Sequence, residues 1–146
     1  MAKHIKAGEK VFVIIYRIGT NGLEFLCLKL SPEPGRSADY YAITGGVEGK
    51  ESFAEAALRE TEEEIGIKPA AIIDLHHQMK YQDHLTREYF IEHCFVIRVN
   101  AEAITLNEEH TAYKWVSADE FISTIWWDDD RSELQQMVNA LQDHKF

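Results

Sequence analysis

The sequence is poor in cysteine and has no long apolar run. The first shortage argues against a disulfide framework, and the second argues against a membrane span. Its two cysteines, Cys27 and Cys94, lie in apolar, strand-like segments, so we expect buried thiols in a reducing compartment instead of a disulfide framework. No segment approaches the roughly 18 apolar residues of a membrane span. The apolar run at 11–16 is shorter than the core of a signal peptide, which needs about 7–15 residues. We therefore expect a cytoplasmic protein.

Positive charge is also scarce. The 146 residues include 15 lysines and arginines against 25 aspartates and glutamates, which gives a formal net charge of −10. Duplex nucleic acids and anionic membranes attract basic proteins, so we expect neither as a partner. The length is typical of one domain, and 45% hydrophobic and 27% charged residues are typical of a globular chain. We predict a single domain over residues 1–146, as a monomer or a homodimer.

Apolar runs and turn residues predict an α/β fold. Continuous β-branched and aromatic runs favour strands, and apolar residues at spacings of three and four favour helices. The predicted strands cover residues 11–16, 24–30, 40–43, 72–81, 88–99 and 113–116, and the predicted helices cover 51–65, 117–122 and 131–141. The third strand runs into Gly45-Gly46, and Gly66 ends the first helix. This order favours a mixed sheet with helices packed on both faces.

The negative charge is concentrated in one segment. Residues 48–64 hold seven acidic and two basic side chains, and their net charge of −5 is half of the total. Within the first predicted helix, Glu60, Glu63 and Glu64 stand at positions i, i+3 and i+4, so their carboxylates project from one side. Like charges at this spacing, and anions near the C-terminal end of a helix, both destabilise the helix. Such an uncompensated local cost points to a functional site.

A hard divalent cation would offset this repulsion. Mg²⁺ takes oxygen ligands and is commonly shared between carboxylates and substrate phosphates. No histidine or cysteine stands at helical spacing with the three glutamates, so zinc is not indicated. The helix alone leaves a second interpretation open, because a run of like charges is usually a solvated surface.

The residues before the helix favour a functional site over a solvated surface. Residues 45–67 read GGVEGKESFAEAALRETEEEIGI, which resembles the Nudix box, G-x5-E-x7-R-E-U-x-E-E-x-G-U, where U is aliphatic. All seven fixed positions are filled, by Gly45, Glu51, Arg59, Glu60, Glu63, Glu64 and Gly66. Ile67 fills the final U, whereas Thr61 stands where an aliphatic residue is usual.

The resemblance implies a fold and an activity. The fold would be the Nudix-type α/β/α sandwich with a mixed β-sheet. The activity would be hydrolysis of a nucleoside diphosphate linked to another group, with Mg²⁺ as the cofactor and Mn²⁺ as an alternative ion. Glu60, Glu63 and Glu64 match the metal ligands of the family. The general base is left open between Glu60, Glu63 and a loop glutamate.

The resemblance also implies supporting roles for the other motif residues. Glu51 and Arg59 would form a structural pair that orients the loop on the helix. Gly45 and Gly46 would provide backbone geometry closed to other residues and a close approach of the main chain to phosphate.

Two further segments narrow the choice of substrate. Residues 41–46 have Thr44 where many members of the family have proline, which is similar to a subgroup that acts on dATP and dihydroneopterin triphosphate. Residues 109–115 resemble a segment shared by that subgroup and the asymmetric diadenosine tetraphosphate hydrolases, in which Glu109 matches a further metal ligand or base. The leading prediction is a triphosphate pyrophosphohydrolase. The alternatives are a dinucleoside polyphosphate hydrolase and a nucleotide sensor without turnover.

A small-molecule nucleotide would need stacking and phosphate-binding groups. Aromatic side chains stack on bases, and cations hold phosphates. The candidates for these roles are Tyr41, Tyr81, Lys29, Arg36 and Arg87. The seven histidines show no ligand spacing and are interpreted as strand or surface residues.

Overall fold

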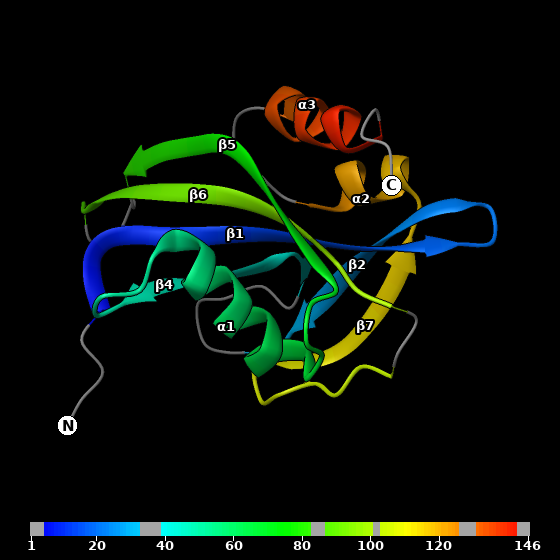
Figure 1. Cartoon of the computed structure of the whole chain (residues 1–146), viewed down its shortest axis with the longest axis horizontal. Coiled ribbons are helices and arrows are strands. Elements are labelled where there is room, and N and C mark those ends of the chain that lie inside the picture. The colour runs from blue at the N-terminus through cyan, green and yellow to red at the C-terminus, as the bar shows by residue number, and fades with distance from the viewer. Residues whose placement is uncertain (1–4, 33–38, 83–86, 101–102, 126–130, 143–146) are drawn as a thin grey trace.

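A computed structural model describes residues 5–32, 39–82, 87–100, 103–125 and 131–142 (Figure 1). Arg36, a predicted phosphate contact, lies outside these ranges. The elements in chain order are β1 (Ile5–Gly19), β2 (Gly22–Leu30), β3 (Tyr40–Tyr41), β4 (Ile43–Glu48), α1 (Phe53–Ile65), β5 (Ala71–Gln82), β6 (Tyr89–Arg98), β7 (His110–Val116), α2 (Ala118–Thr124) and α3 (Arg131–Gln142).

The strands form one mixed sheet around β1. β6 runs parallel to β1, whereas β4 and β2 pair with β1 in the antiparallel direction, β4 along its first part and β2 at its end. The sheet order is β3-β2-β1-β6-β5, with β4 paired to β1 and β7 paired to β2. This arrangement confirms the predicted mixed sheet.

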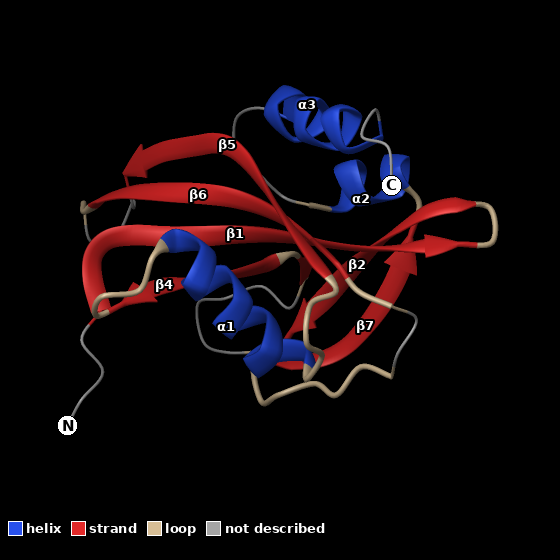
Figure 2. Cartoon of the chain, in the orientation of Figure 1, coloured by secondary structure: helices blue, strands red, loops and turns tan. Residues whose placement is uncertain are grey.

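Helices cover both faces of the sheet, as predicted (Figure 2). Residues 11–16 of β1 are all buried, and alternate side chains point to opposite faces. Phe12 and Ile14 pack in the core under α2 and α3, and Val11 and Val13 pack in the core under α1. The continuous apolar run is therefore a strand buried on both sides, and the layers are α/β/α. Among the described helices, none has the length and apolar character needed to cross a membrane.

Local sequence determines both ends of α1. The Ser52 side chain accepts a hydrogen bond from the Glu55 backbone N–H, and the Glu55 side chain accepts one from the Ser52 N–H, which is a capping box. Gly66 ends the helix with a left-handed backbone, φ 69°, as its position predicts. Thr61 is buried and donates its hydroxyl to the Ala57 carbonyl at 2.8 Å, so the polar departure from the motif is satisfied inside the helix.

The prediction was wrong about the strand before the helix. The single strand expected at 40–43 is two strands, because β3 pairs with β2 while β4 pairs with β1. Gly45 and Gly46 do not follow the strand but lie inside β4, opposite Val11 and Lys10. Pairing with the long strand β1 overrides the low strand propensity of glycine.

Candidate active site

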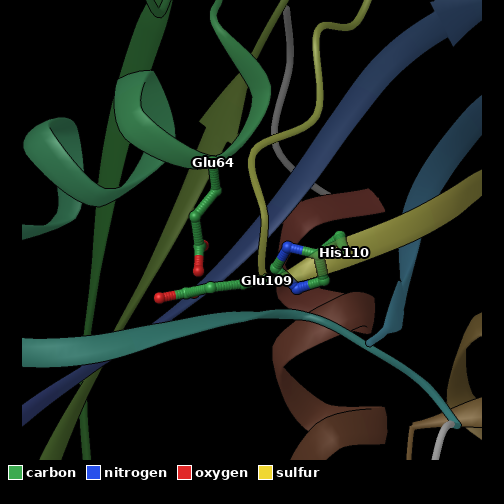
Figure 3. A group of neighbouring side chains, drawn as sticks. All are labelled: Glu64, Glu109 and His110. Atoms are coloured by element: carbon green, nitrogen blue, oxygen red, sulfur yellow. The ribbon is translucent and has the colours of Figure 1, made fainter. Parts of the chain in front are cut away.

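The three glutamates of the motif lie on the last turns of α1, but the structure gives them different surroundings. Glu64 is 2% exposed, whereas Glu60 is partly buried and Glu63 is exposed. Glu64 points from α1 towards the start of β7 (Figure 3). Helical spacing predicts the shared side of the helix, and packing against the sheet decides which carboxylate is buried.

Glu109 reaches the same place from the turn before β7. Its backbone N–H donates to Asn107 Oδ1 at 3.1 Å, and its carbonyl accepts from the Ser31 N–H at 2.8 Å. The Ser31 hydroxyl also donates to the Glu108 carbonyl at 2.8 Å. The turn is thus fastened to the end of β2. One ligand atom each from Glu64, Glu109 and His110 lies within 4.8 Å of the other two.

Burial and like charge make this cluster electrostatically costly. Burial is the largest of several causes that together raise the pKa of Glu64 to about 10; the others are the hydrogen bond to Glu109 and the charges of Glu60, Glu109 and Glu63. Burial also raises the pKa of Glu60, against the lowering effect of Arg59. Glu64 Oε2 is buried and has no hydrogen-bond partner among the described residues. These oxygens fit a divalent cation, which would neutralise the cluster and satisfy the orphan acceptor.

Arg59 links this end of α1 to β4. Its Nε donates to Glu51 Oε2 at 2.7 Å, and its Nη2 donates to the Gly46 carbonyl at 2.9 Å. Its Nη1 donates to Glu60 Oε1 at 2.9 Å and to Glu63 Oε2 at 3.2 Å. The hydrogen bonds to Glu51, first, and to Glu60 raise the pKa of the guanidinium. Arg59 therefore holds the helix on the strand and two of the glutamates in one direction.

Gly45 is required for space and not for an unusual backbone. Positive φ angles occur at four other described glycines but not at Gly45 or Gly46, so the expectation of backbone geometry closed to other residues was wrong. A Cβ atom on Gly45 would overlap the Glu60 carboxylate and lie 2.7 Å from Glu60 Cγ. The missing side chain leaves room for Glu60 between α1 and β4.

We expect Gly45→Ala to lower kcat by about 100-fold, because the added methyl group pushes Glu60 out of place and misplacement of about 1 Å can cost that much. The thermal midpoint should change little, because φ is unstrained. Gly19→Ala is the matched control, since a Cβ there would also overlap a glutamate side chain, that of Glu24, but away from this site. Equal rates for the two variants would contradict the proposed reason for Gly45.

The predicted substrate contacts are spread over the fold. Tyr41 lies in β3 and packs edge-on against Phe12 at 6.0 Å, in the core on the α2 and α3 side. Lys29 is near the end of β2, and Arg87 is exposed just before β6. The Tyr81 backbone lies in β5, and its side chain is outside the described part of the structure. Substrate binding by these residues therefore stays a prediction.

Sequence reasoning missed His110. It is the first residue of β7 and is 6% exposed. The predicted strand at 113–116 starts too late to include it, and the histidines were interpreted only as strand or surface residues; its place beside Glu64 and Glu109 was not predicted. Helical spacing cannot reveal a histidine that reaches the site from a distant strand. The signal that was available in the sequence is that His110 directly follows Glu109.

Comparisons with known proteins agree with this geometry. The NUDIX domain model matches residues 8–137. The chain is 28% identical to dihydroneopterin triphosphate diphosphatase of Escherichia coli (strain K12), over 94% of this chain and 97% of that protein. It is 27% identical to bis(5'-nucleosyl)-tetraphosphatase [asymmetrical] of Rattus norvegicus, over 84% of each. Part of this chain is 34% identical to octanoyltransferase of Myxococcus xanthus. The matched part is 65% of this chain but only 27% of that longer protein.

A solved structure supports the fold. The Ap4A hydrolase of C. elegans, in a binary complex, superposes with a TM-score of 0.77 over 93% of this chain and 98% of that chain. Because the sequence identity is 22%, this similarity supports the fold alone.

Proposed function

Because the chain belongs to the NUDIX domain family and is a hydrolase of phosphoric anhydrides, we propose that it cleaves a nucleoside triphosphate, dATP or a pterin analogue, to a monophosphate and pyrophosphate. The observation that carries the proposal is the buried Glu64 carboxylate beside Glu109, at the end of an acidic helix. The similarity to dihydroneopterin triphosphate diphosphatase over nearly the whole of both chains supports the substrate class.

We assign the cofactor, Mg²⁺ with Mn²⁺ as an alternative, to the carboxylates of Glu60, Glu63, Glu64 and Glu109. Once bound, the cation supplies positive charge against the negative charge that develops on the phosphate oxygens. Arg59 turns Glu60 and Glu63 in one direction. The backbone contacts of Ser31 hold the turn that carries Glu109. The protein thereby holds its carboxylates in place from two separate elements, which lowers the cost of ordering them during the reaction.

A carboxylate oxygen accepts the proton of the attacking water. Glu60, Glu63 and Glu109 are the candidates for this role. Glu63 and Glu109 are exposed, so solvent reaches them directly, whereas Glu60 is partly buried. Glu60 and Glu63 each already accept a hydrogen bond from Arg59. Separate Gln variants of the three residues would distinguish them.

A dinucleoside polyphosphate hydrolase is the second candidate function. The observation that favours it is the similarity to the rat asymmetrical tetraphosphatase over 84% of both chains. The two functions need the same carboxylates and differ in what lies beyond the cleaved anhydride.

Product analysis tests the proposal. With Mg²⁺, we expect pyrophosphate and a monophosphate from dATP or dihydroneopterin triphosphate, at a higher kcat/KM than for diadenosine tetraphosphate. Chelation of the metal should abolish release, because the carboxylate cluster then lacks its counter-charge. A preference for the dinucleotide, with ATP and AMP as products, would favour the second function. Binding of these nucleotides without turnover in the presence of Mg²⁺ would contradict both.

A further inference from the structure

His110 brings a nitrogen donor to the carboxylate cluster. One of its ring nitrogens lies within 4.8 Å of a carboxylate oxygen of Glu64 and of Glu109. Ligands on opposite sides of an ion with bonds of about 2.1 Å are about 4.2 Å apart. Small side-chain rotations therefore suffice to place all three donors around one cation.

A β-bulge explains why His110 faces this site. Lys29 of β2 pairs with Ala112 and Leu30 pairs with His110, so β7 has one extra residue at this point. Without the bulge, His110 would share the face of Ala112. Because paired residues share a face and Leu26 and Leu28 pack under α1, Leu30 and its partner His110 also face α1. Bulges commonly re-aim a side chain in this way.

The surroundings suit a bound ion rather than solvent. His110 and Glu64 are 6% and 2% exposed, and they come from β7 and α1. Glu64 Oε2 has no hydrogen-bond partner in the described part of the chain. Glu109 is exposed, so the position is closed on the side of the core and open to solvent on the side of Glu109.

The chemistry of the donors determines which ion is preferred. Mg²⁺ prefers oxygen ligands and gives up its waters reluctantly. Imidazole nitrogen binds later first-row ions more strongly, and affinity rises from Mn²⁺ to Co²⁺. An imidazole added to the carboxylates therefore shifts the ion preference away from that of a site made of carboxylates alone.

We propose that His110 is a nitrogen ligand to a divalent cation held by Glu64 and Glu109, and that this position prefers Mn²⁺ or Co²⁺ to Mg²⁺. The inference rests on the proposed function, since it assigns a further ligand to the same site.

Pulsed electron paramagnetic resonance of bound Mn²⁺ tests the nitrogen ligand directly. We expect ¹⁴N coupling in the wild-type protein, replaced by ¹⁵N coupling when histidine alone is labelled. The coupling should be lost in His110→Asn and kept in His76→Asn, whose side chain is 86% exposed on β5. His110→Gln provides a second variant if the first does not fold, and the wild-type labelling result requires no variant.

The outcomes separate this proposal from the proposed function. Bound Mn²⁺ without histidine coupling, or coupling that persists in both His110 variants, overturns the nitrogen ligand and leaves the proposed function intact. Failure of the wild-type protein to bind Mn²⁺ overturns the nitrogen ligand, and failure to bind either Mn²⁺ or Mg²⁺ overturns the proposed function as well.

Calorimetric titration tests the ion preference. We expect wild-type protein to bind Mn²⁺ more tightly than Mg²⁺, and His110→Asn to lose about 10- to 100-fold in Mn²⁺ affinity, the range for groups that support a metal site. Mg²⁺ affinity should change much less. An equal loss for both ions would contradict the assigned preference.

Discussion

Replacing Glu64 by glutamine is expected to lower kcat by about 10²–10³-fold, the typical cost of removing one group that stabilises the charge of a transition state. Glutamine keeps the shape of the side chain and removes its charge. The buried carboxylate is then absent from the cluster with Glu60 and Glu109. Because the raised pKa keeps this carboxyl neutral at pH 7 in the absence of metal, glutamine resembles it in charge and shape, and the variant without metal should be about as stable as the wild-type protein. Steady-state kinetics and thermal unfolding together measure the two effects.

Glu62→Gln is the matched control for this prediction. Glu62 is an exposed glutamate on the same helix, and its side chain lies outside the proposed ligand set. We expect its rate to stay within a factor of two of the wild-type rate. A loss of less than about tenfold in Glu64→Gln, or about 1.4 kcal/mol, would remove Glu64 from the proposed metal ligands.

Replacing Arg59 by leucine is expected to destabilise the fold by about 3 kcal/mol, because removing one partner of a largely buried ion pair leaves the other charges uncompensated. Arg59 is 20% exposed and contacts Glu51, Glu60, Glu63 and the Gly46 carbonyl. For a chain of this length the loss corresponds to a fall of about 6–12 °C in the thermal midpoint. Thermal and urea unfolding measure it.

Arg17→Leu is the matched control. Arg17 pairs with Glu24 at 2.9 Å, with side chains 25% and 37% exposed, and also lies over the Trp115 ring. Because this is one ion pair near the surface and not a set of several contacts, we expect a loss of about 1 kcal/mol or less. Arg59→Lys should recover only part of the loss, since lysine lacks the planar fork that reaches α1 and β4 together. Equal destabilisation by the two leucine variants would contradict the linking role of Arg59.

Local patterns account for much of the fold. The apolar run at 11–16 correctly predicts a strand buried on both faces, and Gly66 correctly predicts the end of α1. The split between β3 and β4 could not be predicted, because it depends on which neighbouring strand each segment pairs with. Pairing between distant segments leaves no trace in local propensity.

The candidate site is also predictable in part from local sequence and depends in part on packing and strand pairing. Positions i, i+3 and i+4 predict that the three glutamates share a side of α1, but not that Glu64 is buried and Glu63 exposed. The motif identifies Gly45 without its reason, which is the overlap with Glu60. The place of His110 depends on a bulge in the pairing of β2 and β7, and one extra residue reverses the face of a side chain.

The central claim is that the carboxylates at the end of α1 bind the divalent cation that hydrolysis requires. Thermal unfolding of wild-type and Glu64→Gln protein across a Mg²⁺ titration tests it most directly. Ligand at 100 times its Kd stabilises a fold by about 2.7 kcal/mol, which corresponds to a rise of about 5–10 °C in the wild-type midpoint. We predict that rise in the wild-type protein and little or none in Glu64→Gln. An equal rise in both proteins, or none in the wild-type protein, would contradict the claim.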